Sequence, residues 1–172
     1  MERKLEEVGL KMAPGASAVE FVRRAYFDLH GLPPTVEAVR KFVVAWDEDE
    51  DTAVTGLVEE LLASPRYGER WGQHWLDVVR FAESSGGGRA LLMKEAWRFR
   101  DYVIDSFAAD KPFDQMIREH IAGDLLPHTS NAERREQIVA SGFLPMGPTN
   151  YELPDQMLLP LEVVWLFIHM SP

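Results

Sequence analysis

Three polar side chains lie in one predicted helical segment at spacings that permit acid–base chemistry. His74 follows Arg70 by four residues and precedes Asp77 by three. Residues three and four apart are neighbours on a helix, so Asp77 can hold one tautomer of His74, as a general base requires. The alternative is a histidine at the margin of the core that makes ordinary hydrogen bonds and ion pairs. One histidine and one carboxylate do not complete a metal site, so we expect none here.

Arginines form a second group of candidate ligand-binding residues. Arg100, beside Asp101, is predicted to project into the apolar side of a helix, where an isolated charge is very costly. Its expected partner is Asp77, Asp124 or an acidic group of a ligand, which places all of these residues near one site. The alternative is a structural ion pair between helices.

Arg80 and Glu83 stand just before three glycines at positions 86–88. A chain of this kind can form the rim of a cleft, because glycines allow a ligand to approach closely. The Lys and Ser/Thr of a phosphate-binding loop are missing, so the alternative is a plain flexible connection that ends the preceding helix.

The elements that position these residues are all predicted to be helices. Apolar residues recur with helical spacing, and no window alternates with a period of two, so we expect an all-α fold. The pattern predicts an irregular bundle of about six to seven helices, with long helices near 64–83 and 94–109. Ser17, Thr35, Ser64 and Asn131 are predicted N-caps. The remaining helices of the bundle are expected at 18–29, 36–46, 52–63, 114–122 and 132–141, and a short additional helix at 2–10.

Within 64–83, a helical wheel predicts an inward aromatic stripe with His74 at its margin. We expect the stripe to be core rather than a stacking platform for sugars; it consists of Tyr67, Trp71, Trp75 and Val78. In 94–109, Phe99 and Tyr102 face away from the side that carries Trp97 and Val103. That helix is therefore predicted to be covered on two sides.

Composition excludes several classes of function. The formal net charge is −10, which argues against nucleic acid and against anionic membrane surfaces as partners. There is no cysteine, so this chain has no disulfide and no covalently attached c-type haem, and we expect no cofactor in it. The acidic run at 47–51 lacks the pattern of a calcium loop and is predicted to be a solvated turn.

The start of the sequence is charged and has no apolar core of a secretory signal. No run reaches the roughly 20 apolar residues of a membrane span. These features leave the compartment of the protein open.

Four segments resemble the planctomycete cytochrome-c-associated domain family, a family of unknown function. They occur in the order of the family at 21–35, 61–84, 96–127 and 141–148. The resemblance implies a single helical domain at 1–158 within a large exported bacterial protein. It also implies partners among other domains or proteins of a cytochrome-c-associated system.

The end of the chain departs from the family pattern. Relatives continue with a motif of cysteine and histidine, whereas residues 159–172 form an apolar tail that differs from it, so we expect a truncated chain. His30 and His120 stand where relatives carry other polar residues, and we assign them little functional weight.

Three hypotheses of function follow. The first is a binding or assembly module of a larger exported, cytochrome-c-associated protein, here in partial form. The second is an enzyme or ligand-binding domain whose site includes His74, Asp77, Arg100 and Asp124, for an anionic carbohydrate. The third is a gene fragment without an independent role.

Overall fold

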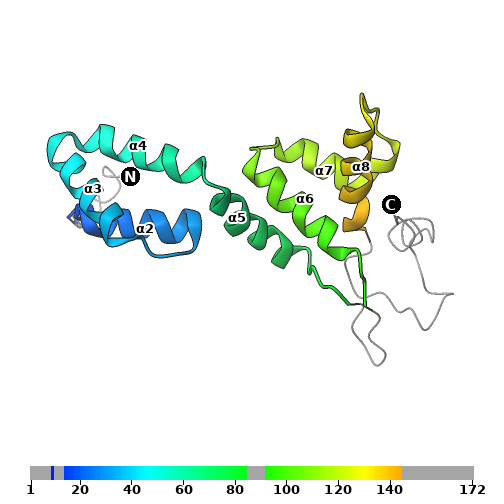
Figure 1. Cartoon of the computed structure of the whole chain (residues 1–172), viewed down its shortest axis with the longest axis horizontal. Helices are drawn as coiled ribbons and strands as arrows, with labels where there is room; N and C mark the ends of the chain where they lie inside the picture. The colour runs from blue at the N-terminus through cyan, green and yellow to red at the C-terminus, as the bar shows by residue number, and fades with distance from the viewer. Residues whose placement is uncertain (1–8, 10–13, 85–91, 145–172) are drawn as a thin grey trace. The chain divides into compact units, whose positions relative to one another are not determined.

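The computed structural model of the chain describes residue 9 and residues 14–84 and 92–144. In these ranges the chain forms seven α-helices and no strand, which confirms the predicted all-α fold (Figure 1). None of these helices is long and apolar enough to cross a membrane. The predicted helix at 2–10, the glycines at 86–88 and the tail at 159–172 lie outside the described residues, apart from Gly9. The chain divides into two compact units, Met1–Leu61 and Leu62–Pro172.

The first unit contains three helices with well-defined ends: α2 (Ala18–His30), α3 (Val36–Glu48) and α4 (Glu50–Leu62). Ser17 and Glu20 form a capping box at the start of α2, so both satisfy backbone N–H groups that the first turn leaves unpaired. Gly31 closes α2 with φ of 71°, which glycine adopts without strain. Thr35 caps α3 by accepting a hydrogen bond from Ala38 N–H.

The acidic run at 47–51 is almost entirely helical. Asp49 alone separates α3 from α4, and its carboxylate accepts hydrogen bonds from Thr52 N–H at 3.2 Å and Thr52 Oγ1 at 2.8 Å. These two bonds lower the pKa of Asp49, and α4 starts two residues earlier than its apolar pattern indicates. All five acidic residues are exposed, as predicted for a solvated segment.

A small core holds the first unit together. Its buried residues come from all three helices: Val22, Phe42, Ala53, Leu57 and Leu61. Phe21 stacks on Phe42 with ring centroids 5.8 Å apart, and Trp46 tilts against both rings. His30 Nε2 forms a hydrogen bond with the carbonyl of Leu61 at 3.0 Å, which ties the end of α2 to α4.

The second unit contains four α-helices and two short 3₁₀ segments. Its core consists of Leu76, Val79, Phe99, Tyr102, Val103, Met116 and Ala140. Ser130, one residue before the predicted Asn131, caps the last helix by accepting a hydrogen bond from Glu133 N–H. The elements are α5 (Pro65–Val78), α6 (Ala96–Ala108), α7 (Phe113–Ala122), η1 (Gly123–Leu125), α8 (Asn131–Ala140) and η2 (Ser141–Phe143).

Helix α5 ends before the predicted residue 83, because Arg80 adopts a left-handed conformation with φ of 58°. Phe81 N–H then bonds to Leu76 O and Arg80 N–H to Asp77 O, which is the Schellman arrangement. Glycine usually takes this position, so an arginine there gives no sequence signal for a helix end.

The most buried face of α5 is a glycine face, which corrects the predicted aromatic stripe at Trp71 and Val78, whereas Trp75 of the stripe packs against the core. Gly68, Gly72 and Leu76 are buried, whereas Trp71 is 37% exposed and Val78 is 71% exposed. A Cβ atom on Gly68 would lie 2.7 Å from Ile104 O and 2.8 Å from Ala108 Cβ. The two glycines therefore allow the backbone of α6 to approach α5 closely, which no large side chain would permit.

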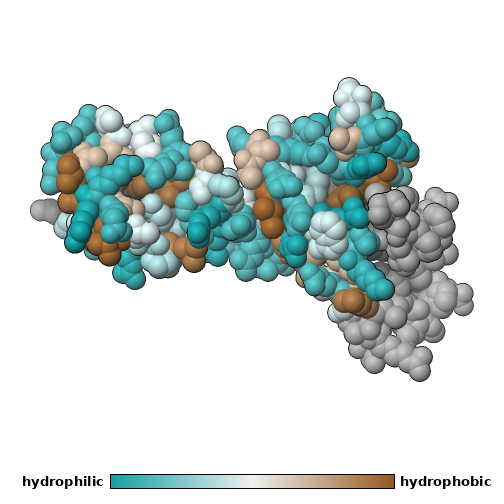
Figure 2. Space-filling model, in the orientation of Figure 1, coloured by the Kyte–Doolittle hydropathy of each residue, from teal (hydrophilic) through white to brown (hydrophobic). Residues whose placement is uncertain are grey.

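Helix α6 is covered on two sides, as predicted, but the deeper side is the one that carries Phe99 and Tyr102. Phe99 and Val103 are fully buried against the rest of the core, and Ile104 faces the glycines of α5. Trp97, predicted to face inward, is 42% exposed. On the face seen in Figure 2, apolar residues form separate patches among hydrophilic ones.

Replacing Arg80 by glycine should stabilise the protein. A left-handed backbone costs a residue with a Cβ about 1–2 kcal/mol, part of which the extra freedom of glycine in the unfolded chain cancels. We expect Arg80→Gly to raise the free energy of unfolding in urea by about 0.5–1 kcal/mol. Arg80→Ala keeps the strain and is the control; an equal gain in both variants would contradict this account of the helix end.

Adding a methyl group should have opposite effects at two glycines. Gly68→Ala forces α5 and α6 apart and should cost about 1–3 kcal/mol. Gly56 of α4 has open space around its Cβ position, so Gly56→Ala should gain up to about 1 kcal/mol from helix propensity. Thermal unfolding of both variants tests the close crossing, and a neutral Gly68→Ala would show that the crossing is loose.

Candidate functional site

The predicted acid–base group lies at the surface of the second unit. His74 and Asp77 are exposed, and the ring of Trp71 packs edge-on against His74 at 5.6 Å. Arg70 is half-buried, and its Nε has no hydrogen-bond partner among the described residues. Within the described part of the chain, no hydrogen bond or ion pair joins the side chain of His74 or Asp77 to Arg100, Asp101 or Asp124.

Arg100 forms its ion pairs with carboxylates other than those predicted. Its guanidinium contacts Asp101 at 2.9 Å and Glu83 at 3.5 Å, and its side chain is 40% exposed. Exposed pairs of this kind stabilise a fold by at most about 1 kcal/mol. Asp124 is exposed in η1, and Arg80 sits at the exposed end of α5. A site shared by these residues stays a prediction.

Among the described residues of the second unit, the most enclosed carboxylate is that of Glu119, on α7. Glu119 is 3% exposed and accepts three hydrogen bonds. The donors are Tyr102 Oη, Lys111 Nζ at 2.8 Å and Gln115 Nε2 at 2.9 Å. Lys111 also lies over the ring of Tyr102, 4.7 Å from its centroid. The cluster thus joins α6, α7 and the turn between them.

These contacts keep Glu119 ionised. Burial by itself raises the pKa of this carboxyl, but the hydrogen bonds from Lys111, Tyr102 and Gln115 outweigh burial and lower it. Burial and the neighbouring carboxylate both raise the pKa of Tyr102. The carboxylate therefore has little basicity left for proton transfer, and its role in the structure is to bind its three donors.

His120 lies next to this cluster and is enclosed by aromatic rings. It is 1% exposed, and Trp75 Nε1–H donates a hydrogen bond to its Nε2 at 3.0 Å. The rings of Phe99, Tyr102 and Phe143 lie between 5.2 and 5.7 Å from the imidazole. Since Nε2 accepts, the proton of the neutral ring is on Nδ1, which is buried and has no hydrogen-bond partner of good geometry among the residues that the structure describes.

Burial lowers the pKa of His120 to about 4, although the charge of Glu119 opposes the shift. The imidazole is therefore neutral at pH 7. A ring that is neutral, enclosed and already bonded to an indole can anchor α7 to α5, but no substrate reaches it in this conformation.

A surface cavity of about 310 Å³ adjoins the Tyr102 and Lys111 end of the cluster, between α6 and α8. Trp97 lines it and Lys111 contributes a cation at its inner side. Other lining residues carry charges of both signs: Arg98, Asp101, Asp105, Arg135 and Glu136. Of the residues predicted from the sequence, Asp101 lies here.

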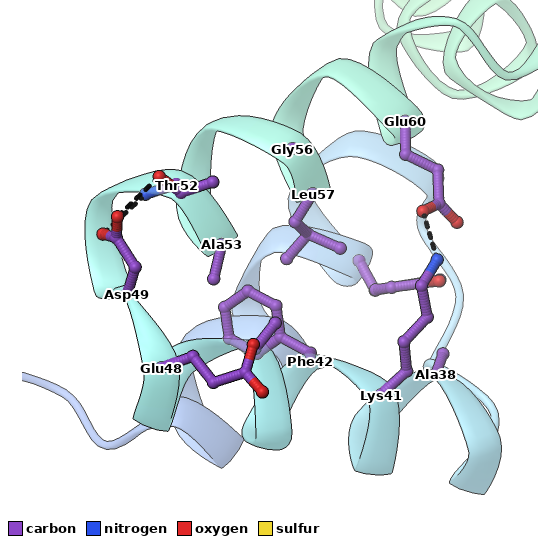
Figure 3. Close-up of a pocket in the computed structure, with 12 residues that line it drawn as sticks. Ala38, Lys41, Phe42, Glu48, Asp49, Thr52, Ala53, Gly56, Leu57 and Glu60 are labelled. Carbon is purple, nitrogen blue, oxygen red and sulfur yellow. Dashed lines mark hydrogen bonds and ion pairs between the residues drawn. The ribbon is translucent and has the colours of Figure 1, made fainter.

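The larger hollow, of about 420 Å³, lies in the first unit, between α3 and α4. We refer to it as the α3/α4 groove. In Figure 3, Phe42, Ala53 and Leu57 meet at its floor. Gly56 borders it from α4 and has no atom within 4 Å of its Cβ position, so the space beside it is open.

Acidic side chains dominate the rim of this groove. Glu48 and Asp49 lie toward one end, and Lys41 bonds to Glu60 at 3.2 Å at the other (Figure 3). Three carboxylates thus face one lysine. An apolar floor with a charged rim is suited to binding a partner side chain.

The predictions from the sequence included neither the buried cluster of Glu119 and His120 nor the α3/α4 groove. Met116, Glu119 and His120 recur at helical spacing on the inner face of α7, and a glutamate and a histidine at such positions signal a satisfied buried network. No pattern in the sequence indicates the α3/α4 groove, because its apolar residues have the spacing of ordinary core residues. In the described ranges, no group of three or more His, Asp and Glu side chains has the arrangement of a metal site.

Taken together, the fold and these sites define an all-helical protein with a buried polar cluster in one unit and an open groove in the other. A family model described as "PSCyt2: Protein of unknown function (DUF1549)" matches residues 1–159, so the chain belongs to this family, as its sequence predicted. No curated protein and no solved structure gives a significant match to the chain.

The low pKa of His120 should make stability depend on pH. In the unfolded chain His120 has a pKa of about 6.5 and binds a proton below that pH. In the folded chain its pKa is about 4, so it stays neutral between these two values. Stability should therefore fall by about 3 kcal/mol as the pH drops from 6.5 to 4.

His120→Phe keeps an aromatic ring and should flatten this part of the profile of unfolding free energy against pH. His74→Gln, at an exposed histidine, is the control and should leave the slope intact. A slope that persists in His120→Phe would show that other groups cause it.

Proposed function

We propose that the chain is a helical binding or assembly module of a larger exported bacterial protein that works together with a c-type cytochrome. The observation that carries this proposal is the open α3/α4 groove, whose floor consists of the apolar core residues Phe42, Ala53 and Leu57. The family name supports the association with a cytochrome, and the proposal extends that name to a physical contact.

The polar core of the second unit supports a structural role for its conspicuous residues. Glu119 is bonded to three donors and His120 is enclosed, so neither has the access or the basicity of a catalytic group. The second unit then supplies a rigid body, and the surface of the first unit supplies the contact.

Ligand binding or enzymatic action on an anionic carbohydrate is the second candidate function. The cavity between α6 and α8 favours it, because Trp97 offers a ring for stacking and Lys111 and Arg135 offer cations for an acidic group. The carboxylates of the same lining, including Asp101 and Asp105, weaken the attraction for an anion. For this reason we favour the binding module.

The test combines binding with assays of turnover. Calorimetry of the purified chain with a purified c-type cytochrome from the same cell should show saturable association. The chain alone should turn over neither redox dyes nor a panel of glycosides that includes uronic acids. Hydrolytic or redox turnover by the chain would overturn the proposal, and activity on the uronic acids would favour the second candidate.

A further inference from the structure

We infer that the α3/α4 groove binds a basic amphipathic helix of a partner protein. The inference rests on the proposed function and names the kind of partner that the groove accepts. It follows from the spacing of the lining residues, the chemistry of the walls and the charge of the rim.

The walls of the groove are two helical faces. The lining positions on α3 recur at intervals of three and four residues, and so do those on α4: Ala38, Lys41, Phe42, Ala45 and Glu48 on one wall, and Thr52, Ala53, Gly56, Leu57 and Glu60 on the other. From Ala38 to Glu48 the wall is about 15 Å long, which matches about three turns of a helix.

The lining is built for inserted side chains. Ala38, Ala45, Ala53 and Gly56 are small, and together they leave a space of about 420 Å³ above Phe42 and Leu57. A helix with its side chains is about 10–12 Å across, so the groove accepts anchoring side chains while the backbone of the partner stays outside. Anchors at positions i, i+4 and i+7 of an amphipathic helix fit this length.

The chemistry of the walls favours a helix over an extended peptide. An extended peptide that binds by strand addition needs a sheet edge that offers backbone N–H and C=O groups. The groove is bordered by α3 and α4, whose backbone groups are already bonded within the helices. A helical partner satisfies its own backbone and needs only side-chain contacts.

The rim selects a basic partner. Glu48, Asp49 and Glu60 face the single cation of Lys41, which already bonds to Glu60. Asp47, Glu50 and Asp51 add negative charge just outside the lining. Lysine or arginine residues that flank the apolar anchors would meet these carboxylates and speed the encounter. A second copy of the groove would bring a like-charged rim, so a symmetric contact through this face is disfavoured.

The probe is a lysine-rich amphipathic helical peptide, titrated into the full chain and followed by fluorescence anisotropy. Two control peptides have the same length: one carries glutamate in place of lysine, and one has the same composition in scrambled order. We expect saturable binding of the lysine peptide alone, with an affinity that falls as salt rises.

Variants of the chain locate the peptide. Gly56→Trp fills the groove and should raise the Kd at least about tenfold. Thr55→Trp adds the same side chain at the neighbouring exposed position outside the lining and should leave the Kd unchanged. Helical circular dichroism confirms that both variants fold.

A second pair of variants separates the rim from overall charge. Glu48→Gln with Glu60→Gln should weaken binding several-fold. Asp28→Asn with Glu59→Gln changes the net charge equally at exposed positions outside the lining and away from the acidic run at 47–51, and should have little effect. Equal losses in the two pairs would show non-specific attraction and overturn the inference.

The remaining outcomes also decide between the two proposals. Binding of the glutamate peptide, or self-association of the chain that Gly56→Trp abolishes, would overturn the basic helix while the binding module stands. If removal of residues 1–13 is needed before the peptide binds, the groove belongs to the chain's own segment and the inference fails. If neither the peptides nor the cytochrome bind, both proposals fail.

Discussion

The buried carboxylate of Glu119 is the interaction on which the second unit depends. A charge in the interior is tolerated only when hydrogen bonds replace the water it has lost, and Tyr102, Lys111 and Gln115 supply them. Meeting this requirement brings α6, the following turn and α7 to fixed positions. Met116 and His120, on the same face of α7, then pack into the core beside it.

Close packing of helices completes the second unit. Gly68 and Gly72 bring α5 against Ile104 of α6, and Trp75 from the same helix reaches His120 with its indole N–H. Large aromatic side chains of α5 are left at the border of the core as a result. Helix α5 therefore buries less side-chain area but lies closer to the backbone of α6. The same packing orients the indole of Trp75, which donates the hydrogen bond to His120.

The first unit is organised differently. Its core is small, α3 and α4 are joined by Asp49 alone, and the groove between the two helices lies above the core residues Phe42, Ala53 and Leu57. Acidic residues line its rim. The buried polar cluster and the groove thus lie in different units of one chain.

The sequence by itself determined the class of fold, the order of the helices, most of their caps and the family. These follow from local rules: apolar spacing, Ser and Thr before a first turn, and glycine at the end of α2. Only the tertiary structure decided which face of α5 is buried, where that helix ends, which carboxylates Arg100 meets and how His120 is enclosed. The physical reason is that each of these depends on a neighbour distant in sequence, such as Ile104 against Gly68 or Trp75 against His120, or on backbone strain at Arg80 that no side-chain pattern reveals.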